Sequence, residues 1–148
     1  MPTTPKSANL TAALCEFTSK VAPIHKDAHG QHSQYATIQA VLAAVTPALA
    51  ECGLAVTQTF TTDSNGKTLL VTTLRHTGGE TVASVVPLVT GGNPRNPLHD
   101  WGGAVTYQRR YSLLSILNLA AGIEDDDGDT ASSRMTRAAS IDTDDGFI

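Results

Sequence analysis

The fold is decided by residues 54–89, LAVTQTFTTDSNGKTLLVTTLRHTGGETVASVVPLV, where the hydrophobic pattern changes from helical to alternating. The alternation predicts three strands, at residues 54–60, 69–74 and 82–89. The letters DSNG and TGG between them are turn sequences that join neighbouring antiparallel strands. Pro87 predicts either an edge position or the end of the third strand, because proline cannot donate a ladder hydrogen bond. This stretch therefore predicts a three-stranded antiparallel meander.

Helical spacing of apolar residues precedes and follows the meander. It predicts helices over residues 8–21, 37–52 and 98–119. Pro47 falls inside the second helix and should kink it or restart it. The order α-α-β-β-β-α indicates an α+β fold, in which helices back one antiparallel sheet. Two polar segments, residues 25–32 and residues 90–97, predict a loop and a mobile linker.

Length and charge indicate one domain followed by an acidic tail. The chain has 148 residues and a net charge of −4. Residues 1–123 carry a net charge of +2, whereas residues 124–148 carry −6. Neither a membrane-spanning run nor a secretory signal is evident, so we expect a cytoplasmic protein. Cys15 and Cys52 have no metal-type spacing and are predicted to be reduced and buried.

A search for catalytic motifs favours a protein that is not an enzyme. The phosphate-binding loop of ATP-driven recombinases is missing from the sequence, as is the nucleophile elbow of hydrolases. His25, His29 and His32 could bind zinc, but a polar loop without a fourth ligand indicates surface histidines. The acidic residues 124–129 lack the glycine and the closing glutamate of a calcium loop. We therefore expect no cofactor beyond weak magnesium binding at that acidic turn.

The segment WGGAVTYQRRYSLL, residues 101–114, interleaves aromatic and basic side chains as proteins that bind single strands do. On a helix, Tyr107 and Tyr111 share one face and Arg110 lies beside Tyr107. Arg109 points about 100° away from Arg110, so we expect the two side chains to have different roles. Arg109 is expected to be the structural one of the two. Spacing alone leaves two interpretations open. The segment is either a nucleic-acid interface or a core motif with one arginine paired to an acid.

The string TYQRRYSL at residues 106–113, followed after a hydrophobic helix by EDDDG at residues 124–128, closely resembles the signature of the ERF (essential recombination function) family. Upstream segments are similar to the N-terminal pattern of that family, including the proline at position 47. The resemblance covers roughly residues 10–130, whereas the three histidines and the pair Asp100-Trp101 depart from the pattern. Those similar upstream segments are Lys26-Asp27, residues 35–38, residues 46–49 and residues 52–54.

The resemblance implies a phage-type recombination protein that binds single-stranded DNA, assembles into rings or filaments, and anneals complementary strands without ATP. The β-β-β-α order also resembles, at the level of fold alone, the ring-forming annealing proteins of eukaryotes. Several of the basic residues expected to contact phosphate could equally be solvated surface charges. The residues expected to bind nucleic acid are Arg109, Arg110, Tyr107, Tyr111, Lys67, Arg75, Arg95 and Lys26.

Two other functions are compatible with the sequence. One is a single-strand binding protein without annealing activity, and the other is a metal-dependent nuclease that uses residues 124–129. The nuclease is disfavoured because neither a lysine nor a histidine lies near those acids in sequence. Residues 141–148, IDTDDGFI, resemble the acidic and then hydrophobic tip of bacterial single-strand binding proteins. The tail is therefore either a disordered solubilising segment or a docking segment for replication proteins of the host or phage.

Overall fold

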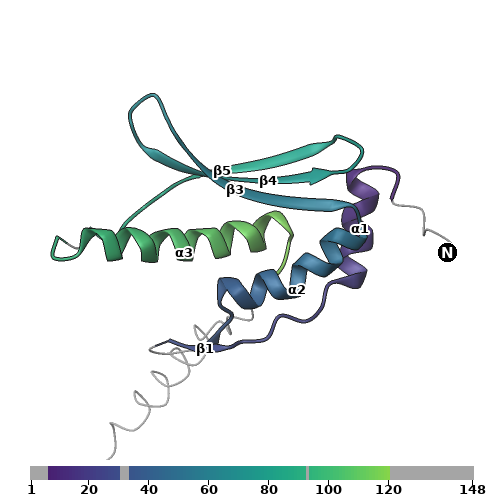
Figure 1. Cartoon of the computed structure of the whole chain (residues 1–148), viewed down its shortest axis with the longest axis horizontal. Coiled ribbons are helices and arrows are strands. Elements are labelled where there is room, and N and C mark those ends of the chain that lie inside the picture. The colour runs from purple at the N-terminus through teal and green to yellow at the C-terminus, as the bar shows by residue number, and fades with distance from the viewer. Residues whose placement is uncertain (1–6, 31–33, 93, 121–148) are drawn as a thin grey trace, which may run out of the picture.

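A computed structural model describes residues 7–30, 34–92 and 94–120 of the chain. It consists of a three-stranded sheet with helices on one side, and a separate two-stranded hairpin lies beyond the helices (Figure 1). This arrangement confirms the predicted α+β fold and its antiparallel meander. The elements are α1 (Leu10–Lys20), β1 (Ala28–His29), β2 (Gln34–Tyr35), α2 (Ile38–Glu51), β3 (Leu54–Thr62), β4 (Thr68–His76), β5 (Thr81–Pro87) and α3 (Pro97–Ile116).

The sheet has the order β3-β4-β5, and each neighbouring pair is antiparallel. Gly66 and Gly79 have φ angles of 79° and 96° in the two connecting turns, a backbone region that favours glycine. In the first turn, the Asp63 carboxylate accepts the backbone N–H groups of Asn65 and Lys67, each at 2.8 Å. Pro87 is the last residue of the edge strand β5, as its missing N–H predicts.

The helices cover only one face of the sheet (Figure 1). Along β4 the side chains of Leu70, Thr72, Leu74 and His76 are buried, because alternate residues of a strand point to the same side. α2 and α3 pack below this face, whereas α1 stands at the end of the sheet where β3 begins (Figure 1). The opposite face of the sheet is not covered by any described helix.

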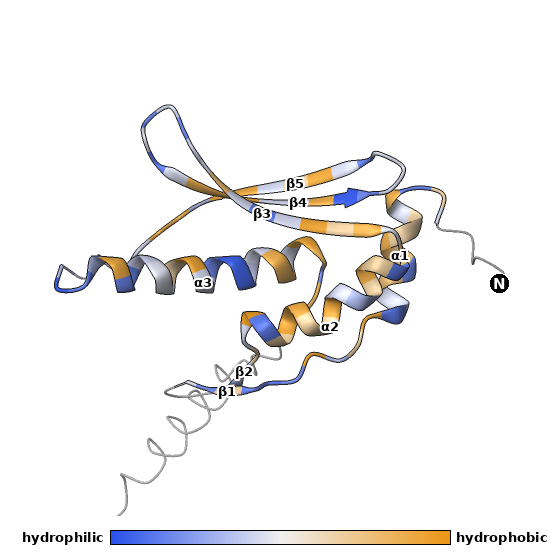
Figure 2. Cartoon of the chain, in the orientation of Figure 1, coloured by the Kyte–Doolittle hydropathy of each residue, from blue (hydrophilic) through white to orange (hydrophobic). Residues whose placement is uncertain are grey.

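The hydrophobic core lies where α1, α2, β4 and the C-terminal turns of α3 converge. Phe17, Val41, Val45, Leu74 and Leu113 have no exposed side-chain surface. Burial of each such side chain contributes about 1.5–3 kcal/mol to stability. Figure 2 shows the C-terminal turns of α3 in hydrophobic colours, while its middle turns are polar. The core therefore contains the C-terminal end of α3, whereas the middle and the start of the helix lie outside it.

Several details differ from the prediction. The polar segment at 25–32 contains strand β1, whose Ala28 pairs with Tyr35 of β2, and a two-residue ladder is too short to leave a periodic pattern. α2 runs continuously through the exposed Pro47 and does not restart there. In the predicted linker the Gly92 N–H donates to the Asp100 carboxylate at 2.9 Å, and α3 already begins at Pro97.

The two cysteines differ in environment. Cys15 is exposed on α1, so the prediction that it is buried was wrong, whereas Cys52 is fully buried at the end of α2. Burial raises the pKa of the Cys52 thiol, and the nearby Glu16 carboxylate adds to this effect. No helix in the described ranges is long and apolar enough to cross a membrane. The expected boundary between residues 123 and 124 lies outside the described residues, as does the acidic tail.

Candidate nucleic-acid interface

Helix α3 is the platform of the candidate site. Its start is well defined, because the Asn96 side chain accepts the His99 N–H at 3.2 Å and Pro97 occupies the first turn. The N-terminal half extends beyond the core, so that Leu98 is 79% exposed. Trp101 steadies this half by packing on Phe60 of β3, with ring centroids 5.8 Å apart.

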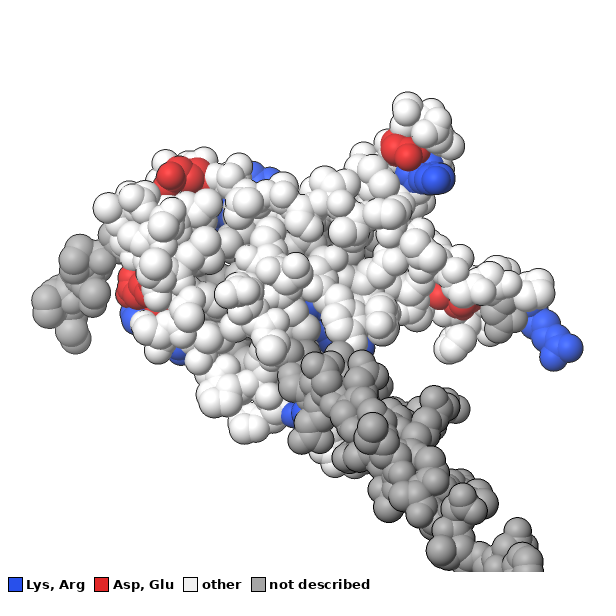
Figure 3. All heavy atoms as spheres, turned by 180° about the vertical axis from the view of Figure 1, so that it is seen from behind, with Lys and Arg blue, Asp and Glu red and all other residues white. Residues whose placement is uncertain are grey.

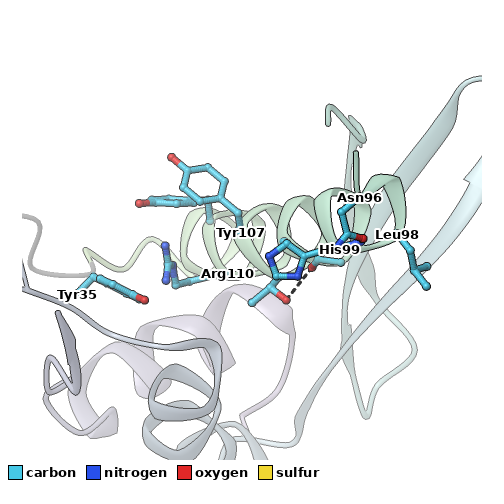
Figure 4. Close-up of a pocket in the computed structure, with 10 residues that line it drawn as sticks. Tyr35, Asn96, Leu98, His99, Tyr107 and Arg110 are labelled. Atoms are coloured by element: carbon cyan, nitrogen blue, oxygen red, sulfur yellow. Dashed lines mark hydrogen bonds between the residues drawn. The ribbon is translucent and has the colours of Figure 1, made fainter. Parts of the chain in front are cut away.

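Arg110 is enclosed by three tyrosine rings near the middle of α3. Its guanidinium carbon lies 5.6 Å from the ring centroid of Tyr107, 5.0 Å from that of Tyr111 and 4.7 Å from that of Tyr35. Tyr35 comes from β2 and approaches Arg110 from the side away from Tyr107 (Figure 4). Such cation–π contacts contribute about 0.5–2 kcal/mol each. We call these four residues the tyrosine–arginine cluster.

Among the described residues, Arg110 has few partners for its charge. Its side chain is 8% exposed, and its one hydrogen bond to a described residue runs from Nη1 to the Ala36 carbonyl at 3.3 Å. Within the described ranges no carboxylate lies at ion-pair distance from it. A guanidinium offers five N–H donors, and a buried charge is costly unless an opposite charge matches it. The cluster is therefore suited to receive an anion.

The phenol of Tyr107 keeps its proton at neutral pH. A hydrogen bond with Tyr111 raises the pKa of Tyr107 above its ordinary value, and the Arg110 guanidinium opposes this only in part. The ring centroids of Tyr107 and Tyr111 lie 4.4 Å apart. Tyr107 is 57% exposed, so its ring is available for stacking by a planar ligand.

Arg109 has a different role from Arg110. Its Nε donates to the Gln58 side-chain oxygen at 3.2 Å, and the Gln58 amide donates to the Arg109 carbonyl at 2.9 Å. The same amide donates to Thr72 of β4 at 3.1 Å. These bonds fasten α3 to two strands, as expected for the more structural arginine. The structure nevertheless makes Arg110 the more buried of the two, which the spacing did not indicate.

A cavity of about 1080 Å³ opens beside the cluster (Figure 4). This volume is comparable with that of small-molecule sites, which span roughly 300–1,000 Å³. The described lining residues carry aromatic, aliphatic, basic, amide and hydroxyl side chains, and none of them is an acid. The lining residues are Tyr35, Asn96, Leu98, His99, Gly102, Gly103, Thr106, Tyr107, Arg110 and Tyr111. Sequence reasoning assigned no binding role to Tyr35, Asn96, His99 or the two glycines, although Tyr35 belongs to one of the segments similar to the ERF family.

Gly102 and Gly103 stand inside α3 and line this cavity. Glycine in a helix interior costs about 1 kcal/mol relative to alanine. A Cβ atom built at either position meets no described atom within 4 Å, so packing within the described chain does not demand a glycine there. Their small size leaves the helix backbone open towards the cavity.

The other expected phosphate contacts are not brought together with the cluster. Lys67 is exposed after the β3–β4 turn, Arg75 is exposed on β4, and Arg95 is exposed just before α3. Lys26 is half-buried in the segment before β1. Figure 3 shows the basic side chains of one face in small separate groups rather than in a continuous patch. The structure thus unites Tyr107, Tyr111 and Arg110 and leaves the remaining basic residues apart.

The histidine segment shows no metal site within the described ranges. No group of three or more His, Cys, Asp or Glu side chains in residues 7–30, 34–92 and 94–120 is placed to hold an ion. His29 Nε2 lies 3.1 Å from the Gln34 side-chain amide. His32 and the acidic residues 124–129 lie outside the described residues.

Comparison with known proteins places the chain in a family. The model of the ERF superfamily matches residues 10–146, a range that includes α3 with its tyrosines and arginines. Neither the curated proteins nor the solved structures gave a match. Because the family match covers most of the sequence, this chain belongs to the ERF superfamily.

Proposed function

We propose that the protein binds single-stranded DNA and anneals complementary strands without ATP in phage-type homologous recombination. ERF membership suggests recombination by strand annealing in general. The single observation that carries the assignment to α3 is the buried Arg110, which has no acidic partner among the described residues, beside the exposed ring of Tyr107. A guanidinium for phosphate and an aromatic face for a base are what single-strand binding requires.

Annealing requires that each protomer binds the backbone of a strand and leaves the base edges available for pairing. Stacking on Tyr107 occupies the face of a base and leaves its edges free. The domain over residues 1–123 carries only +2, so a single copy has little electrostatic affinity for DNA. Binding by many identical copies in register supplies the affinity that one copy lacks.

We propose that these copies form a ring or filament. In the described part of the chain, β3 and β5 are the outer strands of the sheet, and an outer strand presents unpaired backbone groups. Light scattering at micromolar concentration should give a mass of many subunits, with or without single-stranded DNA. A strict monomer under both conditions would contradict this assembly.

The annealing experiment mixes two complementary labelled oligonucleotides with the protein in the absence of ATP. We expect faster pairing than in buffer alone. Tyr107→Ala should lose most of this acceleration, because one base–aromatic stack contributes about 1–3 kcal/mol. Tyr107→Phe is the matched control, since it keeps the ring and should retain most activity. Tight binding combined with slower pairing would instead support the alternative, a single-strand binding protein without annealing activity.

We propose that annealing by this protein involves no catalytic step and needs no cofactor. We further propose that the protein acts in the cytoplasm of the host cell.

An incubation with magnesium and plasmid DNA tests the nuclease alternative directly. Intact plasmid is the expected result, and cleavage that depends on the acidic residues 124–129 would contradict the proposal.

A further inference from the structure

The paired glycines of α3 have no explanation in the packing of the described residues. Gly102 and Gly103 occupy a helix interior, where alanine would be more stable and would meet open space. Both line the cavity beside the tyrosine–arginine cluster, which lies further along the same helix apart from Tyr35. Glycine serves where another molecule must approach a backbone closely.

Arg110 gives a second and independent indication of a ligand. It is more than nine-tenths buried, lines the same cavity, and uses one of its five N–H donors on a described residue. The described residues of the cavity lining include no carboxylate that would repel an anion, and Asn96 and Thr106 add polar groups. A ligand that fits this lining combines a flat ring with negative charge.

We propose that the cavity holds one unpaired nucleotide of the bound strand, and that Gly102 and Gly103 leave room for it to lie against the helix backbone. The inference rests on the proposed function and specifies it further. The base stacks on the exposed face of Tyr107, and the phosphate is directed towards Arg110. A paired duplex cannot enter in this way, because its bases are stacked on one another.

The test compares Gly102→Ala with the wild-type full chain, using a fluorescein-labelled oligothymidylate and fluorescence anisotropy. The added methyl group fills part of the cavity and also favours the helix. We expect affinity to fall tenfold or more while Tm rises by a few degrees. Ser115→Ala is the matched control, because it raises helix propensity at an exposed position outside the cavity and should bind as the wild type does.

The outcomes separate this inference from the function on which it rests. If the wild type binds the oligonucleotide and both Gly102→Ala and the bulkier Gly102→Leu bind equally well, the strand does not enter the cavity, but the proposed function stands. If the wild type fails to bind, the proposed function and the inference fail together. Loss of subunit assembly by light scattering in Gly102→Ala would assign the cavity to a neighbouring copy and overturn the inference. Displacement of the oligonucleotide by an equal concentration of blunt duplex would overturn it as well.

Discussion

Two adjacent arginines of α3 have different surroundings. Arg109 is held by Gln58 through a reciprocal pair of hydrogen bonds, whereas Arg110 faces aromatic rings and a cavity. Adjacent helical residues point about 100° apart, so this difference follows from the helix itself. The string Arg109-Arg110 therefore contains one residue that positions the helix and one that faces the cavity.

We expect the alanine variants of these arginines to differ in kind. Arg109→Ala should lower the free energy of unfolding by about 1–3 kcal/mol, because the half-buried side-chain oxygen of Gln58 loses its partner. It should change DNA affinity little. Arg110→Ala should lower affinity tenfold or more and also cost some stability, since the guanidinium packs on three rings. Urea denaturation and anisotropy measure the two effects separately. If both variants fold, assemble and bind DNA normally, then Arg109 and Arg110 belong to a core motif and the assignment of this site is wrong.

Asp27 predicts a pH dependence of stability. Its carboxylate accepts the Thr37 N–H and the Thr37 hydroxyl, both at 2.7 Å, and these two bonds lower its pKa. A lowered folded-state pKa gives stability that is present above the unfolded value of about 3.9 and is lost as the pH falls through the folded value. Asp27→Asn should therefore be less stable than the wild type at pH 7, by urea midpoint. The difference should narrow below about pH 4, and a constant difference would contradict this account.

At the scale of the element, the two halves of α3 differ in their surroundings. Its C-terminal turns bury Leu113 and Leu114 in the core, while its N-terminal half carries the exposed Leu98 and the two glycines. Gln58 is one link between α3 and the sheet, because its side chain reaches both Arg109 and Thr72. We therefore expect substitutions in the C-terminal turns to change mainly stability, and substitutions in the N-terminal half to change mainly binding.

Gln58→Ala should weaken this link. We expect a loss of about 1–3 kcal/mol in the free energy of unfolding, because Arg109 and Thr72 both lose a half-buried partner. Thr57→Ala is the matched control, since Thr57 is the exposed neighbour on the same strand and should change stability by less than about 0.5 kcal/mol. Equal effects in the two variants would show that the contact with Arg109 contributes nothing specific.

The elements themselves could largely be predicted from local pattern. The alternating hydrophobic pattern and the turn residues predicted the meander correctly, because each strand pairs with its neighbour in sequence. The tyrosine–arginine cluster could be predicted only in part. Tyr107, Tyr111 and Arg110 lie on one helix, whereas Tyr35 reaches Arg110 from a hairpin of two-residue strands. Contacts between residues far apart in sequence leave no periodic signal, which is also why the cavity could not be foreseen.

At the scale of the whole molecule, the distribution of charge matters more than its total. The residues up to 123 carry +2 and residues 124–148 carry −6, although the latter lie outside the described residues. An acidic segment tethered to a weakly basic domain competes with phosphate for the same basic side chains. The acidic segment should therefore weaken DNA binding, by an amount that depends on salt.

Truncation after Ser140 tests this competition, because it removes Asp142, Asp144 and Asp145 together with the apolar pair Phe147-Ile148. We expect the shortened chain to bind single-stranded DNA more tightly at low salt, since screening is weak there. The advantage should shrink as ionic strength rises and the Debye length falls from about 30 Å at 0.01 M to about 10 Å at 0.1 M. A full-length variant with the three aspartates changed to asparagine separates the contribution of charge from that of the apolar pair.

If this variant binds DNA as tightly as the truncated chain does, charge alone explains the effect. If its affinity equals that of the wild type, the effect belongs to the apolar pair. Equal affinities of the wild-type and truncated chains across the salt series would leave only a solubilising role for these residues.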